Sequence, residues 1–243
     1  MELKTYKDIF MRTMHFMRLN YLHLIPFSFV LFVLLLLVGF VSVTSNKLSL
    51  IILAMVSPLL FSFAFYMHRL EKYGEHTWKN FFNIYGDIVR FYKVQGIKYL
   101  MFLIALLPMI IILQFELAAF GFDLELFYHA EKSGAYLPSP YLYLSTFFSV
   151  TLTMLCYPFV IFPEYFYIFE KLDIKTAYRK SFELAKRNYF TLLFLMVIQI
   201  VIFSLGTFLS CGFLFVLALP FFSILTYYVY DSDLNPSKSS TEG

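Results

Sequence analysis

The fold of this chain is decided by the run Asn188–Tyr230, which reads NYFTLLFLMVIQIVIFSLGTFLSCGFLFVLALPFFSILTYYVY. The run contains no charged residue. As one helix it would be about 65 Å long at ~1.5 Å per residue, about twice the ~30 Å hydrocarbon core of a bilayer. We therefore expect it to fold back within a membrane. The turn is predicted at Ser210–Gly212, because glycine lacks the Cβ that restricts the backbone.

The composition of the whole chain extends this prediction. The 243 residues are 60% hydrophobic and 14% charged, with a mean hydropathy of +0.72. Soluble domains are about 45–50% apolar and about 25% charged, so lipid is the expected solvent. Six apolar runs have about the ~20 residues that one crossing needs. They are Leu22–Val43, Leu48–Met67, Tyr99–Phe115, Tyr141–Pro163, Tyr189–Cys211 and Gly212–Tyr230.

The lysines and arginines predict the orientation. With six spans, all 19 except Lys47 and Lys132 fall on the side of the termini, and this excess is typical of the cytoplasmic face. Leu22–Val43 is longer than the ~7–15-residue core of a signal peptide and lacks a cleavage site, so we expect it to be retained. The sequence predicts a multi-pass protein of the cytoplasmic (inner) membrane, with one transmembrane domain over 1–230 and a disordered tail over 231–243.

A basic amphipathic stretch precedes each pair of spans, most clearly Ile174–Tyr189. Its apolar positions recur at three- and four-residue spacing, while its basic residues occupy the other helical face. Such a helix is expected to lie in the membrane interface with its basic face against anionic head groups or a partner protein. The residues of that face are Lys175, Arg179, Lys180, Lys186 and Arg187.

The N-terminal segment repeats this register at an offset of 168 residues. Trp78–Tyr92 is a third, looser copy. We therefore expect an all-α protein of three transmembrane hairpins, each preceded by an interfacial helix, with backbone bends near Asn20 and Asn188. A chance match between short basic helices is the alternative. The matched pairs are Lys7 with Lys175, Arg12 with Lys180, Thr13 with Ser181, Arg18 with Lys186, and Asn20-Tyr21 with Asn188-Tyr189.

One part of the chain resembles a known family. The matching residues are Glu170, Ala177, Ser181-Phe182-x-Leu184 and Asn188-Tyr189-Phe190, and the ending Pro220 to Asp231 also fits. This pattern is similar to the membrane domain attached to some bacterial glycerophosphodiester phosphodiesterases, and to stand-alone membrane families related to it. Tyr178 and Arg187 depart from the usual leucine and glycine. The soluble phosphodiesterase domain is absent from the sequence, so the resemblance implies architecture and no catalytic residue.

Between Tyr141 and Glu170, a stretch without lysine or arginine, Glu164 is the only acidic residue. An intramembrane carboxylate would handle protons or cations, since such groups are costly in lipid. Counting ~1.5 Å per residue from Tyr141 instead puts Glu164 about 34 Å along the helix, at the inner interface, and this count favours the interface. Pro158 and Pro163 keep both interpretations open, because they break the helix and free backbone carbonyls.

Other polar and helix-breaking residues fall inside the spans. Gln199 lies at the middle of the fifth span, where an interhelical hydrogen bond of about 1 kcal/mol is favoured over contact with a substrate. Prolines interrupt five spans and could act as hinges, although static kinks are the commoner result. These prolines are Pro26, Pro58, Pro108, Pro158 and Pro220.

Nothing in the sequence has the pattern of an enzyme. It contains no G-x-S-x-G, Walker or Rossmann motif, and its five histidines are scattered without metal-ligand spacing. We expect no catalytic residue, no metal and no cofactor.

Three classes of function remain. In the first, the helices move or accommodate a small or lipidic molecule without catalysis. In the second, the chain is a structural or accessory subunit whose basic helices dock a partner or anionic lipid. The third is a lipid-modifying enzyme, which would need clustered acids and histidines that the sequence lacks. The expected partners are membrane lipids, together with a protein partner or a second copy of the chain, and no nucleic acid.

Overall fold

A computed structural model of the chain describes residues 3–44, 46–121, 124–134, 136–209 and 213–234. These residues form helices and connecting turns, without strands. The elements are α1 (Leu3–Thr44), α2 (Asn46–Tyr73), the 3-10 helix η1 (Trp78–Asp87), α3 (Ile88–Ala118), α4 (Leu124–Lys132), α5 (Pro140–Cys156), the 3-10 helix η2 (Tyr157–Val160), α6 (Pro163–Ile168), α7 (Ile174–Leu209) and α8 (Phe213–Leu234).

Five helical segments are long and apolar enough to cross a membrane, so the expectation of an all-α, multi-pass membrane protein is confirmed at that level. The sixth expected span corresponds to a shorter apolar helix, Val216–Ser232. The turn predicted at Ser210–Gly212 lies outside the described residues, as does most of the tail after Asp231. The five segments are Lys7–Ser42, Ile51–Tyr73, Trp78–Ala118, Pro140–Ile168 and Ile174–Ile202.

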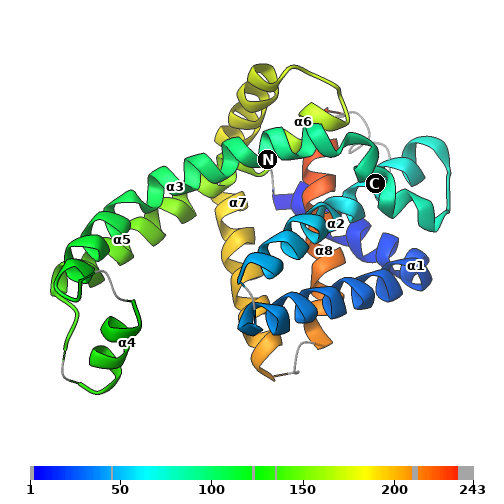
Figure 1. Cartoon of the computed structure of the whole chain (residues 1–243). Coiled ribbons are helices and arrows are strands. Elements are labelled where there is room, and N and C mark those ends of the chain that lie inside the picture. The colour runs from blue at the N-terminus through cyan, green and yellow to red at the C-terminus, as the bar shows by residue number, and fades with distance from the viewer. Residues whose placement is uncertain (1–2, 45, 122–123, 135, 210–212, 235–243) are drawn as a thin grey trace.

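Two groups of helices make up the molecule (Figure 1). The helices α1, α2, α7 and α8 gather into a bundle, while α3 and α5 lie side by side and extend away from it, with α4 near their far end. The two groups meet where α3 contacts α6 and η1. The outer part of the α3–α5 pair therefore exposes apolar surface on most sides, which suits a helix pair surrounded by lipid.

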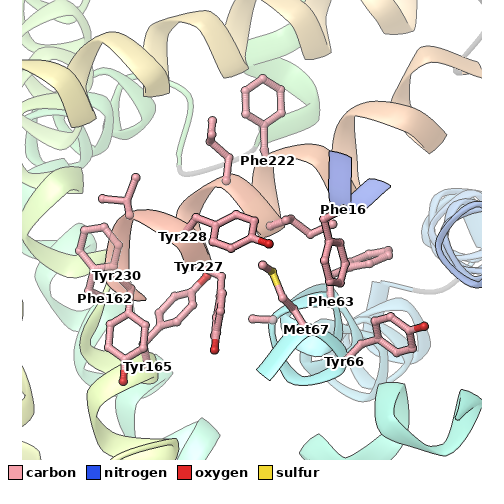
Figure 2. Packing of buried hydrophobic residues seen from close by; sticks show 14 of the residues in the cluster. Phe16, Phe63, Tyr66, Met67, Phe162, Tyr165, Phe222, Tyr227, Tyr228 and Tyr230 are labelled. Atoms are coloured by element: carbon pink, nitrogen blue, oxygen red, sulfur yellow. The ribbon is translucent and has the colours of Figure 1, made fainter. Parts of the chain in front are cut away.

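The core of the bundle is aromatic. Tyrosines near the end of α8 reach toward Tyr165 of α6 on one side and toward Phe63 and Met67 of α2 on the other (Figure 2). The ring centroids of Tyr165 and Tyr230 are 5.2 Å apart. Because lipid is as apolar as these side chains, their contribution comes from close contact between rings rather than from the removal of water.

The third amphipathic stretch differs from its prediction. Trp78–Tyr92 was expected to be an interfacial α-helix, but it forms the 3-10 helix η1 and then enters α3. Part of its apolar surface is covered by protein: Phe81 is fully buried, stacked on Phe27 at 4.0 Å and on Tyr66 at 4.4 Å between ring centroids. Tyr85 and Tyr92, at the same helical spacing, are exposed. The sequence pattern could not say which of these positions α1 and α2, rather than lipid, would cover.

A break in α7 lies at Asn188, the position predicted for a bend. The backbone there is non-helical (φ −116°, ψ 18°), and the Asn188 side chain donates a hydrogen bond of 3.1 Å to the Leu184 carbonyl. At the start of α7, the Asp173 carboxylate caps the helix by accepting from the Thr176 backbone N–H at 3.0 Å. Hydrogen bonds from the Thr176 hydroxyl and backbone lower the pKa of Asp173.

Helix α1 bends too, within the region that matches α7. Phe10 packs on Phe221 and Ser28 donates to the Val216 carbonyl at 2.6 Å. In a straight helix Phe10 and Ser28 would be about 27 Å apart, whereas their partners on α8 are separated by about 7.5 Å. Figure 1 shows α1 turning back along its length. Asn20 lies between the two contacts and donates to the Phe16 carbonyl at 3.0 Å, as Asn188 does to Leu184.

The fourth expected span is not one continuous helix. Helix α5 ends at Cys156, η2 contains Pro158, and α6 begins at Pro163, because proline lacks the N–H that would continue the helix. Two carbonyls at this break gain donors from α7: the Ser181 hydroxyl donates to Phe159 at 2.9 Å and the Tyr189 hydroxyl to Leu155 at 3.1 Å. The remaining predicted kink sites, Pro26, Pro58, Pro108 and Pro220, lie inside helices that continue through them.

Candidate functional site

A buried ion pair joins α3 to α6. Glu164, in the first turn of α6, is 2% exposed. Its Oε1 accepts a hydrogen bond from the Lys98 ammonium at 2.8 Å and another from the Gln95 amide at 2.9 Å. The depth count from Tyr141 assumed one straight helix. The break at Pro158 and Pro163 removes that assumption, and the carboxylate faces the interior between helices.

The second oxygen of this carboxylate has no hydrogen-bond partner among the residues that the structure describes. Glu164 Oε2 is buried and accepts no hydrogen bond from any group that the structure describes. A buried acceptor without a donor costs free energy, about 1–3 kcal/mol for a neutral group and more for a charged one. Within the described part of the chain, Oε2 is therefore a buried acceptor whose hydrogen bond is not made.

The ion pair lines a cavity of about 490 Å³ between the two groups of helices. Gln199 of α7, the second intramembrane polar residue predicted from the sequence, lines the same cavity. Its described lining contains two charged residues, Lys98 and Glu164. The other polar lining residues are Ser57, Gln95, Ser223 and Thr226, and the aromatic ones are Phe61, Phe91, Tyr99, Tyr157, Tyr165 and Phe222.

The local sequence explains why α3 contributes its residues together. Phe91, Gln95 and Lys98 follow one another at spacings of four and three, which places them on one face of a helix. The sequence interpretation counted Lys98 among the loop residues that precede the third span, and so missed its role. The four- and three-residue spacing could have indicated that Lys98 belongs to the helix, because α3 runs without interruption from Ile88 through Lys98 into the span.

The family-pattern residues between Glu170 and Phe190 lie next to this site, and none of them lines the cavity. Ala177, Ser181 and Leu184 are fully buried, and Asn188 forms the break in α7. Phe182 is half exposed, stacked on Phe159 with 4.8 Å between centroids. Through these contacts and the Ser181 hydrogen bond, α7 holds the η2–α6 segment that carries Glu164.

Glu170, the first residue of the pattern, binds two helices at once. Its carboxylate accepts from Lys180 of α7 at 2.9 Å and from the Tyr230 hydroxyl of α8 at 3.0 Å. Lys180 also lies over the Phe166 ring, 5.6 Å from its centroid. Lys180, which the sequence places on the outward basic face, therefore makes an ion pair within the protein while its side chain stays 39% exposed.

The other four residues of the predicted basic face are exposed: Lys175, Arg179, Lys186 and Arg187. Arg179 lies 3.9 Å from Glu183, and both side chains are well exposed, so this ion pair contributes little to stability. The apolar face of the same helix packs on η2 and α6. The segment Ile174–Asn188 is therefore a helix whose apolar face packs on protein and whose basic side chains are exposed on the opposite face.

Glu116, near the end of α3, forms hydrogen bonds with the segment that leads into α5. Its buried carboxylate accepts hydrogen bonds from the Tyr136 hydroxyl, the Ser139 hydroxyl and the Ser139 backbone N–H, the last at 3.0 Å. The hydrogen bond to Glu116 raises the pKa of Tyr136 to about 12. The short helix α4 lies in the same connection between α3 and α5.

A second cavity of about 910 Å³ lies between α1, α7 and α8. It is lined by apolar side chains such as Phe10, Phe194 and Phe221, with Lys7 as its charged residue. Among the described residues, no group of three histidine, cysteine, aspartate or glutamate side chains could hold a metal ion.

Comparisons with known proteins relate the chain to no other: no family model, no curated protein and no solved structure matches it.

Proposed function

We propose that this chain is a non-enzymatic multi-pass membrane protein whose helices bind a small polar molecule in the 490 Å³ cavity and move or accommodate it. One observation carries the proposal: the buried Glu164–Lys98 pair lines that cavity, and one carboxylate oxygen has no donor in the described part of the chain. A purely structural ion pair would be expected to satisfy both oxygens.

The energetics of buried charge support this proposal. A buried ion pair adds little stability compared with apolar residues of the same size, because removing the charges from water is costly. Ionisable side chains within a membrane protein interior therefore commonly mark binding sites or pathways. The volume of the cavity, and its few polar groups on mostly apolar walls, are typical of small-molecule sites.

Solvent access to the cavity is the first test. In a Cys156→Ser, Cys211→Ser background, Gln199→Cys should react with 2-(trimethylammonium)ethyl methanethiosulfonate, which attacks ionised thiols and so requires water. Ile200→Cys is the matched control, because the neighbouring residue lies at the same depth on α7 but is exposed on the outside of the protein, where lipid is expected. We expect Gln199→Cys to react at least tenfold faster.

The side from which the reagent enters separates the two forms of the proposal. Reaction both in intact cells and in inside-out vesicles would indicate that the protein moves its ligand, and reaction from one side would indicate that it only accommodates it. Equal rates at positions 199 and 200, or no reaction from either side, would contradict the proposed function.

The proposal includes a topology of six crossings in three hairpins, with both termini in the cytoplasm, as the distribution of lysine and arginine predicts. Cysteines introduced one at a time at Ser45, Ser133 and Ser237 test it with an impermeant maleimide. We expect the first two to be labelled from outside intact cells and the third only after permeabilisation, because the basic loops hold their side of the protein in the cytoplasm. Labelling of position 237 in intact cells would refute this orientation.

The second candidate function is an accessory subunit that docks an acidic partner or anionic lipid. The exposed basic face of α7, with Lys175, Arg179 and Lys186, favours it. Glutamine at these three positions would leave the cavity unchanged. Loss of cellular function in that variant, with the thiol reactivity at position 199 retained, would favour docking over solute binding.

A further inference from the structure

We infer that the molecule bound in the cavity is a small zwitterion, whose ammonium group donates to Glu164 Oε2 and whose anionic group accepts from the Lys98 ammonium. This inference rests on the proposed function and specifies the chemical class of its ligand.

The unpaired carboxylate oxygen defines one end of the ligand. Glu164 Oε1 already accepts from Lys98 and Gln95, so Oε2 is the atom left for an incoming donor. Charge-assisted hydrogen bonds from an ammonium to a carboxylate are about twice as strong as neutral ones, particularly where water is excluded. A ligand ammonium therefore gains most at this oxygen.

The charge balance of the cavity defines the other end. Lys98 and Glu164 are the charged residues of the described lining, and together they carry no net charge. A ligand with a net charge would leave that charge without a counter-charge beside this buried pair, which is unfavourable. A zwitterion adds no net charge, and Lys98, a donor of three hydrogen bonds, has N–H groups beyond the one that meets Glu164.

The remaining lining suits the same ligand. Tyr99, Tyr157 and Tyr165 surround the pair with aromatic rings, whose faces attract cations and whose bodies pack against apolar parts of a ligand. Gln199 adds an amide from α7, which can both donate to an anionic group and accept from an ammonium. The cavity volume of about 490 Å³ accommodates a small amphipathic molecule.

Three probes with the same aromatic skeleton test this inference: L-phenylalanine (zwitterion), 2-phenylethylamine (cation) and 3-phenylpropionate (anion). Each is titrated at neutral pH against the purified full chain in detergent micelles, and the melting temperature is followed, since a ligand that binds the folded state raises it. Glycine serves as a smaller zwitterion. We expect at least one zwitterion to bind at least tenfold more tightly than the cation and the anion.

Charge variants predict a reversal of selectivity. Glu164→Gln leaves the Lys98 charge unbalanced, so the variant should prefer 3-phenylpropionate. Lys98→Gln leaves the carboxylate unbalanced, so it should prefer 2-phenylethylamine. The double variant Lys98→Gln, Glu164→Gln keeps hydrogen-bonding side chains without buried charge, and should fold but bind zwitterions at least tenfold more weakly. Lys186→Gln, an exposed lysine outside the cavity, is the control and should behave as the wild type.

The inference is overturned if the wild type prefers either charged probe, if no zwitterion raises its melting temperature, or if the double variant binds zwitterions unchanged. The thiol experiment distinguishes this failure from that of the proposed function. A reactive Gln199→Cys with no zwitterion binding would leave the proposed function standing and reject the ligand class, whereas an unreactive one would reject both.

Discussion

Replacing Lys98 by methionine should lower the free energy of unfolding by about 3–5 kcal/mol, because it leaves the Glu164 carboxylate buried without its counter-charge. The Lys98 side chain is 16% exposed and that of Glu164 is 3% exposed, so water can do little to compensate. Equilibrium unfolding in mixed micelles with increasing dodecyl sulfate would measure the change.

The double variant Lys98→Met, Glu164→Leu is the critical comparison. Removing both charges together removes the desolvation penalty as well, so this variant should be within about 1 kcal/mol of the wild type or more stable. The coupling between the two sites would then be several kcal/mol. If the two single variants and the double variant all lose stability additively, Lys98 and Glu164 do not act as a pair.

Replacing Phe81 by alanine should also lower the free energy of unfolding by about 3–5 kcal/mol. The ring is fully buried and stacked between Phe27 and Tyr66, so its loss removes both stacked contacts and opens a cavity where η1 meets α1 and α2. Phe82→Ala is the matched control. Its side chain is half exposed and makes an edge contact with Phe27 at 6.0 Å between centroids, so about 1 kcal/mol or less is expected.

The same micellar unfolding measurement compares the two phenylalanine variants. If Phe81→Ala lowers the free energy of unfolding no more than Phe82→Ala does, then η1 is not closely packed on α1 and α2. The comparison also tests whether α1 and α2 cover η1, because an interfacial helix lying on lipid would show no such difference between its two faces.

The helical spans could be predicted from the sequence because a membrane leaves few alternatives. Every backbone polar group must be satisfied within its own segment, so an uncharged run of the right length becomes a helix. The bend at Asn188 was also predictable, since an asparagine side chain beside a basic amphipathic helix offers a local hydrogen bond to the backbone.

The cavity was only partly predictable. Glu164 and Gln199 stood out as polar groups in apolar runs, but nothing local indicated that they would line one space. Lys98 was assigned to a loop because it directly precedes the uncharged part of the third span. Its pairing with Glu164 depends on how the α3–α5 pair meets α6, and that packing is set by contacts between segments distant in sequence.

The proline break between α5 and α6 also constrains the order in which the chain can be completed during synthesis. The carbonyls of Leu155 and Phe159 receive their donors from Tyr189 and Ser181, which leave the ribosome only after the fourth span has been made. Until then, these two carbonyls lack those donors, and unsatisfied carbonyls are costly in lipid. The fourth span therefore reaches its final state only together with α7. The nascent segment up to Phe169 cannot complete its hydrogen bonds until α7 has been synthesised.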